Sequence, residues 1–192
     1  MRAISLISSV LVTILVSCLS QQDVGSDQHA TTSIDQLPTL RSVSAFIGTD
    51  QDSMPFNASK MKGKVWIASF FFTSCGTVCP ALNTVLADLQ RDYSAKVSFV
   101  SLTSDPDYDT PSVMKEYGAR YGARQGTWWF VTMPKDSMMT VASRDLGLTE
   151  PASPDIHSTR FVLIDKDMHV RGFYDSADTA AVARLRAVLE KI

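Results

Sequence analysis

Residues 65–80 read VWIASFFFTSCGTVCP, and this stretch decides which fold the rest of the chain can adopt. Residues 65–72 are apolar on both faces of an extended chain, which is typical of a central, buried strand. Pro80 must lie in the first turn of the helix that follows, because a proline deeper inside would break it. The stretch therefore predicts a strand that leads into a helix, with Cys75 and Cys79 at the junction.

The remaining candidate elements alternate between strands and helices. Two short extended segments at 42–47 and 54–57 predict an N-terminal hairpin, and further strands are expected at 97–102, 127–132, 160–165 and 169–174, the last two as a hairpin. Helices are expected from about 80 to 93, 110 to 121, 135 to 146 and 177 to 192. This order predicts an α/β domain with a thioredoxin-like central mixed sheet flanked by helices.

The composition is that of one globular domain. The 192 residues are 45% hydrophobic and 20% charged, which supplies enough apolar side chains for a substantial core. The net charge of −2 shows no basic excess, so nucleic acid is not expected as a partner.

The N-terminus resembles a lipoprotein signal. Arg2 precedes a mostly apolar stretch at 3–16, which is too short to span a bilayer as a helix. It ends in Leu-Val-Ser-Cys18, which resembles a bacterial lipobox, so we expect cleavage before Cys18 and a lipid anchor on it. Simple cleavage, with Cys18 lost or left in a tail, is the alternative.

We therefore predict a signal peptide at 1–17, a flexible polar tether at 18–38 and a globular domain at 39–192. The domain would be exported and lipid-anchored to a membrane of the bacterial cell envelope, on its extracytoplasmic side. Outside the cytoplasm, two nearby thiols can oxidise to a disulfide unless a reductant or a metal intervenes.

The spacing of Cys75 and Cys79 permits two kinds of chemistry. On a helical turn, residues four apart have Cβ atoms about 6 Å apart, so the pair can form a disulfide or hold one ion together. The positive end of the helix favours the thiolate form that both functions need. A redox C-x-x-C motif has one residue fewer between its cysteines, which weakens the redox interpretation without excluding it.

A metal held by two thiolates needs a further ligand, and the chain has three histidines. His29 lies in the predicted tether, and His169 follows a hairpin turn where it is expected to be exposed. His157 lies between a proline-containing loop and an apolar strand, where it is either a ligand or a partly buried structural residue. Two thiolates with an imidazole suit Cu(I), and also Zn or Cu(II).

Three motifs, taken together, resemble the SCO/SenC family. They are a strand followed by Cys-x-x-x-Cys-Pro, the sequence SDPDYDTP at 104–111, and the sequence IHST at 156–159, which runs after Arg160 into FVLID. The resemblance covers roughly residue 38 to the C-terminus. It implies a thioredoxin-like fold and copper bound by Cys75, Cys79 and His157, with Cu(I) favoured and Cu(II) possible.

The resemblance also implies a function. Members of this family are metallochaperones that help to assemble the dinuclear copper A site of cytochrome c oxidase subunit II, so subunit II or another copper acceptor is the expected partner. Membrane anchoring outside the cytoplasm is typical of them. The alternative is a thiol–disulfide oxidoreductase that keeps the acceptor cysteines reduced, with a Cys75–Cys79 disulfide in its cycle and a thiol reductant as a partner. Only this alternative would make the chain an enzyme.

Two further features concern the surroundings of the site. Asp105 and Asp109 either lie near the site, where they orient a ligand or meet a partner, or simply form a turn and start a helix. Gly76 stands where the family usually has proline, which leaves the three expected ligands in place but changes the loop between the thiols. The segment between Thr132 and His157 is also shorter than expected for the family.

Overall fold

One eight-stranded mixed sheet forms the centre of the computed structural model, which describes residues 32–148 and 158–192. The strand order is β1-β8-β7-β4-β5-β6-β2-β3, with β4, β5 and β6 parallel to one another and every other pair antiparallel. The strands are β1 (Arg41–Ser42), β2 (Ile47–Asp50), β3 (Pro55–Asn57), β4 (Val65–Phe71), β5 (Val97–Thr103), β6 (Trp128–Thr132), β7 (Arg160–Ile164) and β8 (His169–Asp175).

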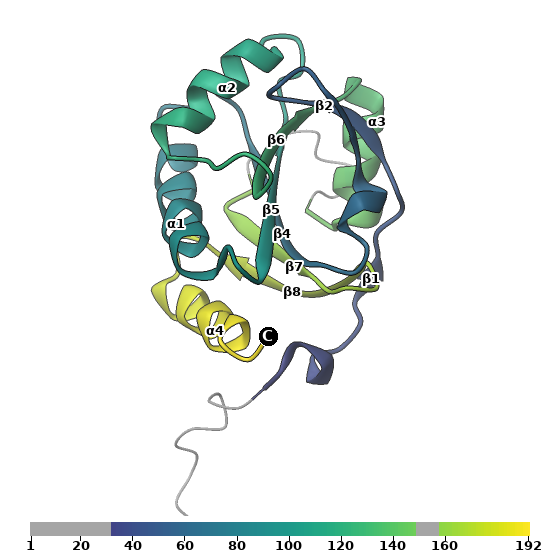
Figure 1. Ribbon diagram of the computed structural model, residues 1–192, viewed down its shortest axis with the longest axis vertical. Helices are drawn as coiled ribbons and strands as arrows, with labels where there is room; N and C mark the ends of the chain where they lie inside the picture. Colours follow the sequence, from purple (N-terminus) through teal and green to yellow (C-terminus); the bar gives the residue numbers. More distant parts are fainter. Residues whose placement is uncertain (1–31, 149–157) are drawn as a thin grey trace, which may run out of the picture.

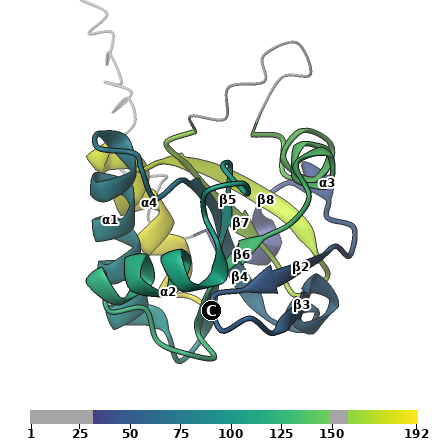
Figure 2. The same cartoon turned by 90° about the horizontal axis from the view of Figure 1, so that it is seen from above.

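Helices cover both faces of this sheet (Figures 1 and 2). The helices α1 (Val78–Tyr93), α2 (Pro111–Arg120) and α4 (Thr179–Leu189) lie on one face. The helix α3 (Lys135–Thr140), which continues as a π-helical turn (Val141–Asp145), lies on the other. The predicted fold class, an α/β domain with a mixed sheet between helices, is confirmed.

Strand β4 explains this arrangement. Its seven residues are all buried, and the six apolar ones alternate between two hydrophobic clusters. Trp66 belongs to the cluster on the α3 side, and Ile67 belongs to the cluster that includes α1, α2 and α4. A strand that is apolar on both faces requires a helix layer on each side, and the central position predicted for it is confirmed.

The N-terminal region differs from the prediction. The hairpin exists, but its first strand is Ile47–Asp50, which pairs with Pro55–Asn57. Ser42 instead pairs with β8, and Val43 and Phe46 turn into the core, where each is at most 7% exposed. Burial of these two side chains three residues apart does not fit the alternation of a strand, which is why the chain between them is irregular.

Packed structure also begins before the predicted domain boundary at residue 39. A 3₁₀ turn, Ile34–Gln36, is closed by a capping box from Ser33, and Ile34 is only 7% exposed within the cluster on the α1 side. A second 3₁₀ turn, Ala58–Met61, leads into β4. The part of the chain before residue 32, which includes Cys18 and His29, lies outside the described residues.

The helix starts follow from local sequence. Pro80 is the third residue of α1, as predicted. Thr110 caps α2 by accepting a hydrogen bond from the Val113 backbone, and Pro111 occupies the first turn. Asp178 caps α4 in the same way, so this helix begins two residues later than predicted. No helix among the described residues has both the length and the apolar character needed to cross a bilayer.

Candidate functional site at the cysteine loop

The two predicted thiols lie close together where the chain passes from β4 to α1. β4 ends at Phe71, and the cysteine loop, residues 72–77, leads to α1, of which Cys79 is the second residue. The Cys79 backbone N–H donates to the Cys75 sulfur across 3.4 Å. Cys75 and Cys79 are free thiols here and are only 8% and 4% exposed. The structure therefore brings the pair together at the amino end of a helix, as the spacing predicts.

The environment of Cys75 favours its thiolate. Burial disfavours the charged form, but hydrogen bonds from the Cys79 thiol, the Cys79 backbone and Thr77 outweigh burial and lower the pKa of Cys75 from 9.0 to about 7. The Thr77 hydroxyl lies 3.9 Å from the Cys75 sulfur. Near neutral pH a large fraction of Cys75 is therefore the nucleophilic and metal-binding form.

The environment of Cys79 has the opposite effect. Burial is the largest influence and raises the pKa of this thiol to about 12, and the hydrogen bond to Cys75 and the negative charge of Asp109 act in the same direction. When the pair loses one proton, Cys75 therefore becomes the thiolate and Cys79 keeps its proton and donates a hydrogen bond to it.

Asp109 connects the cysteine loop to the end of β5. Its carboxylate is fully buried and accepts hydrogen bonds from the Thr73 backbone at 3.2 Å, from the Thr73 hydroxyl and from the Thr103 hydroxyl. Its backbone N–H donates to the Asp105 carbonyl at 2.9 Å. Asp109 therefore does not cap α2, because Thr110 does. It fixes the cysteine loop through a residue two positions before Cys75.

Asp105 has a simpler role in the described structure. Its carbonyl accepts from the backbone N–H groups of Tyr108 and Asp109, and its own N–H donates to the Thr103 hydroxyl at 3.0 Å. These bonds form the turn that the sequence predicts. Whether Asp105 or Asp109 also orients a ligand or meets a partner stays a prediction.

Two buried polar residues beneath Cys79 were missed by sequence reasoning. Asn83 lies one helical turn after Cys79, is fully buried, and donates through Nδ2 to the Tyr117 hydroxyl at 2.9 Å. Burial raises the pKa of Tyr117 well above its usual range, and the neighbouring Tyr121 and Cys79 contribute to this shift. The available signal was an asparagine four residues after a cysteine on an otherwise apolar helix face.

A metal ion needs more donors than the two thiols. Among residues 32–148 and 158–192, no group of three or more His, Cys, Asp and Glu side chains could hold an ion. His157, the predicted third ligand, lies outside the described residues. His169 begins β8 and has its Nδ1 3.5 Å from Asp165, so it belongs to the β7–β8 turn and not to the cysteine loop.

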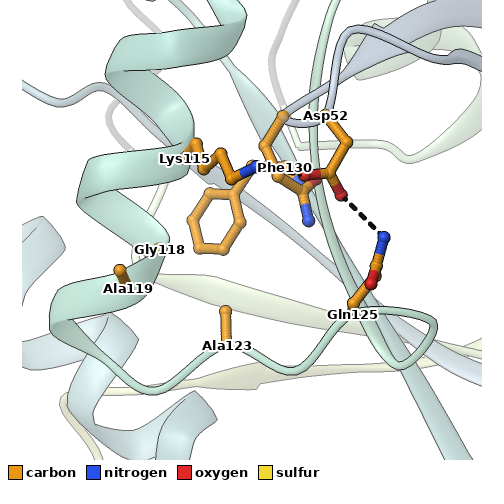
Figure 3. Close-up of a pocket in the computed structure, with 8 residues that line it drawn as sticks. Asp52, Lys115, Gly118, Ala119, Ala123, Gln125 and Phe130 are labelled. Carbon is orange, nitrogen blue, oxygen red and sulfur yellow. Dashed lines mark hydrogen bonds and ion pairs between the residues drawn. The ribbon is translucent and has the colours of Figure 1, made fainter.

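A hollow between α2, β6 and the β2–β3 turn is a separate feature (Figure 3). Its polar side chains bond to one another or to the backbone. Lys115 pairs with Asp52 at 3.0 Å, Gln125 donates to the same carboxylate, and Gln51 bonds the backbone of β6. Because these groups already have partners and no cysteine lines the hollow, the cysteine loop is the stronger candidate for chemistry.

Comparison with known proteins identifies relatives of the whole domain. The family model described as SCO1/SenC matches residues 35–191. The SCO1 protein homolog of Bacillus subtilis is 30% identical over 73% of this chain and 77% of its own length. A protein of Stutzerimonas stutzeri whose description is copper binding is 28% identical over 71% of this chain and 70% of its own.

Solved structures agree with these sequence matches. A SCO1/SenC family lipoprotein from Bacillus anthracis is 30% identical, with a TM-score of 0.69 over 78% of this chain and 94% of that one. BsSco, described as a member of the Sco family of cytochrome c oxidase assembly proteins with a disulfide switch, is 25% identical, with a TM-score of 0.70 over 81% of this chain and 96% of that one. The predicted thioredoxin-like fold is thereby confirmed.

Proposed function

The chain belongs to the SCO1/SenC family, and we propose on this premise that it is a copper metallochaperone. It would bind copper through Cys75, Cys79 and His157 and deliver it to the dinuclear copper A site of cytochrome c oxidase subunit II. The observation that carries this proposal is the pair of free, buried thiols at the β4–α1 junction, one of which has its pKa lowered to about 7 by the hydrogen bonds around it.

The sheet register supports His157 as the third ligand. β7 runs antiparallel to β4, with Val162 opposite Ala68 and Ile164 opposite Trp66. The amino end of β7 therefore lies toward the carboxyl end of β4, which is the edge from which the cysteine loop emerges. His157 precedes β7 by three residues in the sequence. No other His, Cys, Asp or Glu among the described residues completes a three-ligand group with the thiols.

The ligand set suits copper as a transferred cargo. Two soft thiolates with an imidazole favour Cu(I) and can also accept Cu(II). A three-ligand site leaves room for a thiolate of the acceptor to join before one of the original ligands leaves. Ligand exchange of this kind moves the ion without releasing it to water. Cys75, the more exposed and more acidic thiol, is suited to meet the acceptor first.

Anaerobic Cu(I) titration against a competing chelator tests the proposal. We expect His157→Ala to weaken copper binding by more than the roughly 10- to 100-fold that removal of an outer-shell partner costs. Cys75→Ser and Cys79→Ser should weaken it further. The matched control is His169→Ala, which removes the imidazole of the β7–β8 turn and should leave the affinity unchanged. Equal affinities of His157→Ala and His169→Ala would refute the three-ligand site.

We also propose that the exported chain is anchored to the envelope membrane by a lipid on Cys18. The lipobox-like sequence before Cys18 supports this proposal, as does the similarity to a Bacillus anthracis protein described as a lipoprotein. Mass spectrometry of the mature N-terminus tests it. A diacylated Cys18 that disappears in Cys18→Ser is the expected result, and an unmodified N-terminus at another residue would contradict it.

Thiol–disulfide exchange is a second candidate function, which the different acidities of the two thiols favour. The Cys75 thiolate would attack a disulfide of the acceptor and form a mixed disulfide, and Cys79 would then displace the second acceptor thiol. The acceptor gains two electrons, the Cys75–Cys79 pair becomes a disulfide, and a thiol reductant restores it. His157→Ala separates the two functions, because it should impair copper binding and leave this exchange intact.

A further inference from the structure

Four exposed lysines of this chain gather at the end of the sheet opposite the thiols. β4 and β5 begin side by side, with Val65 opposite Val97, and Lys64 and Lys96 immediately precede these two residues. β7 is antiparallel to β4 and therefore ends at the same edge, two residues before Lys166. The Gly63 backbone N–H donates to the Lys166 carbonyl at 2.8 Å. This bond places Lys62 and Lys64, the neighbours of Gly63, beside the β7–β8 turn.

We call Lys62, Lys64, Lys96 and Lys166 the basic end. All four side chains are exposed, and within the described part of the chain no ion pair is recorded for any of them. Because the whole chain has a net charge of −2, this cluster reflects segregation of charge and not an overall excess.

The acidic groups at this end do not cancel the lysines. Asp165 is buried and its carboxylate accepts a hydrogen bond from Arg171 at 2.5 Å, so this pair contributes no net charge. Asp35, Asp167 and Glu190 are exposed there and offset part of the positive charge. Lys191 lines the same shallow hollow as these two aspartates. The basic end therefore keeps an excess of positive charge at its surface.

The opposite end of the sheet, which we call the cysteine end, carries the thiols and several aspartates. The cysteine loop follows β4, and the loop after β5 contains Asp105, Asp107 and Asp109. Since β6 is parallel to β5, Lys135, just after β6, also lies at this cysteine end. It is an exposed lysine far along the strands from the basic end, which makes it an internal control.

The first described turn of the chain packs against the basic end, whereas Thr32 lines a separate hollow with Gly172 and Tyr174, farther along β8. Ser33, Ile34 and Asp35 line one hollow together with Val65, the first residue of β4, and with Lys166. Figure 1 shows this purple N-terminal segment close to the C-terminus of the chain. A lipid on Cys18 would keep the domain close to the bilayer, and the charge of the basic end would then decide which end faces the membrane.

We propose that the basic end docks on anionic phospholipid headgroups of the membrane that holds the anchor, so that the cysteine loop faces away from the bilayer. This proposal rests on the proposed anchor at Cys18. The anchor makes docking intramolecular, so a modest electrostatic attraction is sufficient to orient the domain. Exposed lysines are attracted to an anionic bilayer only within about a Debye length, so the docking is salt-sensitive.

Lysine footprinting tests the proposal on the mature, membrane-extracted protein. The protein is reconstituted into vesicles of phosphatidylcholine alone and into equimolar phosphatidylcholine and phosphatidylglycerol, and exposed lysines are labelled with a membrane-impermeant amine reagent. We expect labelling of the basic end to fall several-fold in the anionic vesicles and to recover in high salt. Labelling of Lys135 and Lys115 should be the same in both.

The outcomes are distinguishable. Flotation with neutral vesicles reports the anchor, whereas the difference between neutral and anionic vesicles reports the basic end. Equal labelling of the basic end in both vesicles would overturn the proposal even if the anchor is present. Protection that occurs only after a second, acidic protein is added would also overturn it, because the occupant would then be that protein. Replacing Lys62, Lys64 and Lys166 by Gln should abolish any difference in the labelling of Lys96, whereas Lys135→Gln should not.

Discussion

The difference in acidity between the two thiols predicts which of them reacts first. With a pKa of about 7 for Cys75 and about 12 for Cys79, roughly 90% of Cys75 and about 0.01% of Cys79 are thiolate at pH ~8. A more basic thiolate is intrinsically more nucleophilic, so over five pKa units the Cys79 thiolate reacts about 100 to 300 times faster than the Cys75 thiolate. The expected preference for Cys75 at this pH is therefore about 30- to 100-fold.

Limited alkylation measures this preference. The fully reduced protein is treated without oxygen with less than one equivalent of iodoacetamide, quenched with acid and mapped by mass spectrometry. The rate at Cys75 should rise through pH ~7 and level off above it. Thr77→Val, which removes a hydrogen bond to the Cys75 sulfur, should move this midpoint upward. Protein unfolded in urea should lose the preference, because both thiols then have ordinary acidities.

Equal alkylation of the two cysteines in the folded protein would refute the reasoning. It would mean that the Cys79 backbone N–H and the helix terminus do not stabilise the Cys75 thiolate as the geometry indicates. A preference for Cys79 would contradict it more strongly, since Cys79 is the more buried of the two. In either case the assignment of Cys75 as the residue that meets the acceptor would have to be withdrawn.

Three other predictions concern stability and are measured by urea unfolding of the reduced protein. Asp109→Ala removes the only recorded acceptor of the Thr73 backbone N–H among the described residues and should lower the free energy of unfolding by about 3 kcal/mol. The control, Asp107→Ala at an exposed position, should lower it by less than about 0.5 kcal/mol. Equal losses would contradict the role of Asp109 in holding the cysteine loop. The lowered pKa of Cys75 means that the unfolded chain binds more protons between pH ~7 and ~9, so the free energy of unfolding should rise over this range relative to Cys75→Ser. Tyr117→Phe leaves the buried Asn83 amide without its acceptor and should lower the free energy of unfolding by about 1–3 kcal/mol. The double variant with Asn83→Leu should lose less than the sum of the two single losses, and strict additivity would contradict an interaction between these residues.

The sequence could predict the centre of the fold because local rules and burial agree there. Residues 65–72 are apolar on both faces, and Pro80 limits where the helix can start, so the position of the thiols follows directly. At the N-terminus the same rules failed, because Val43 and Phe46 are placed by tertiary contacts and not by strand alternation. Short segments of this kind are decided by what they pack against.

The site itself could be predicted only in part. Spacing brought Cys75 and Cys79 together, but the partner of Asp109 is Thr73, which is 36 residues away in the sequence. The sequence indicated that Asp109 either starts a helix or orients a ligand or partner at the site. In the structure it instead accepts hydrogen bonds from Thr73 and so holds the cysteine loop in place. A long-range hydrogen bond between two polar residues leaves no periodic signal, so such contacts emerge only from the folded chain.

The family resemblance implies proline at the position that Gly76 occupies in the cysteine loop, and the structure limits what glycine can change there. A Cβ added at Gly76 would meet no described atom within 4 Å, and its φ lies outside the left-handed region that favours glycine. Neither packing nor backbone conformation therefore requires glycine here. The bond from the Cys79 N–H to the Cys75 sulfur does not involve residue 76 either. Glycine at this position adds conformational entropy to the unfolded loop, worth about 0.4–1 kcal/mol relative to a residue that fits the same backbone. The two thiols thus keep their relative position, and a difference from relatives should appear in how readily the loop moves when copper enters or leaves.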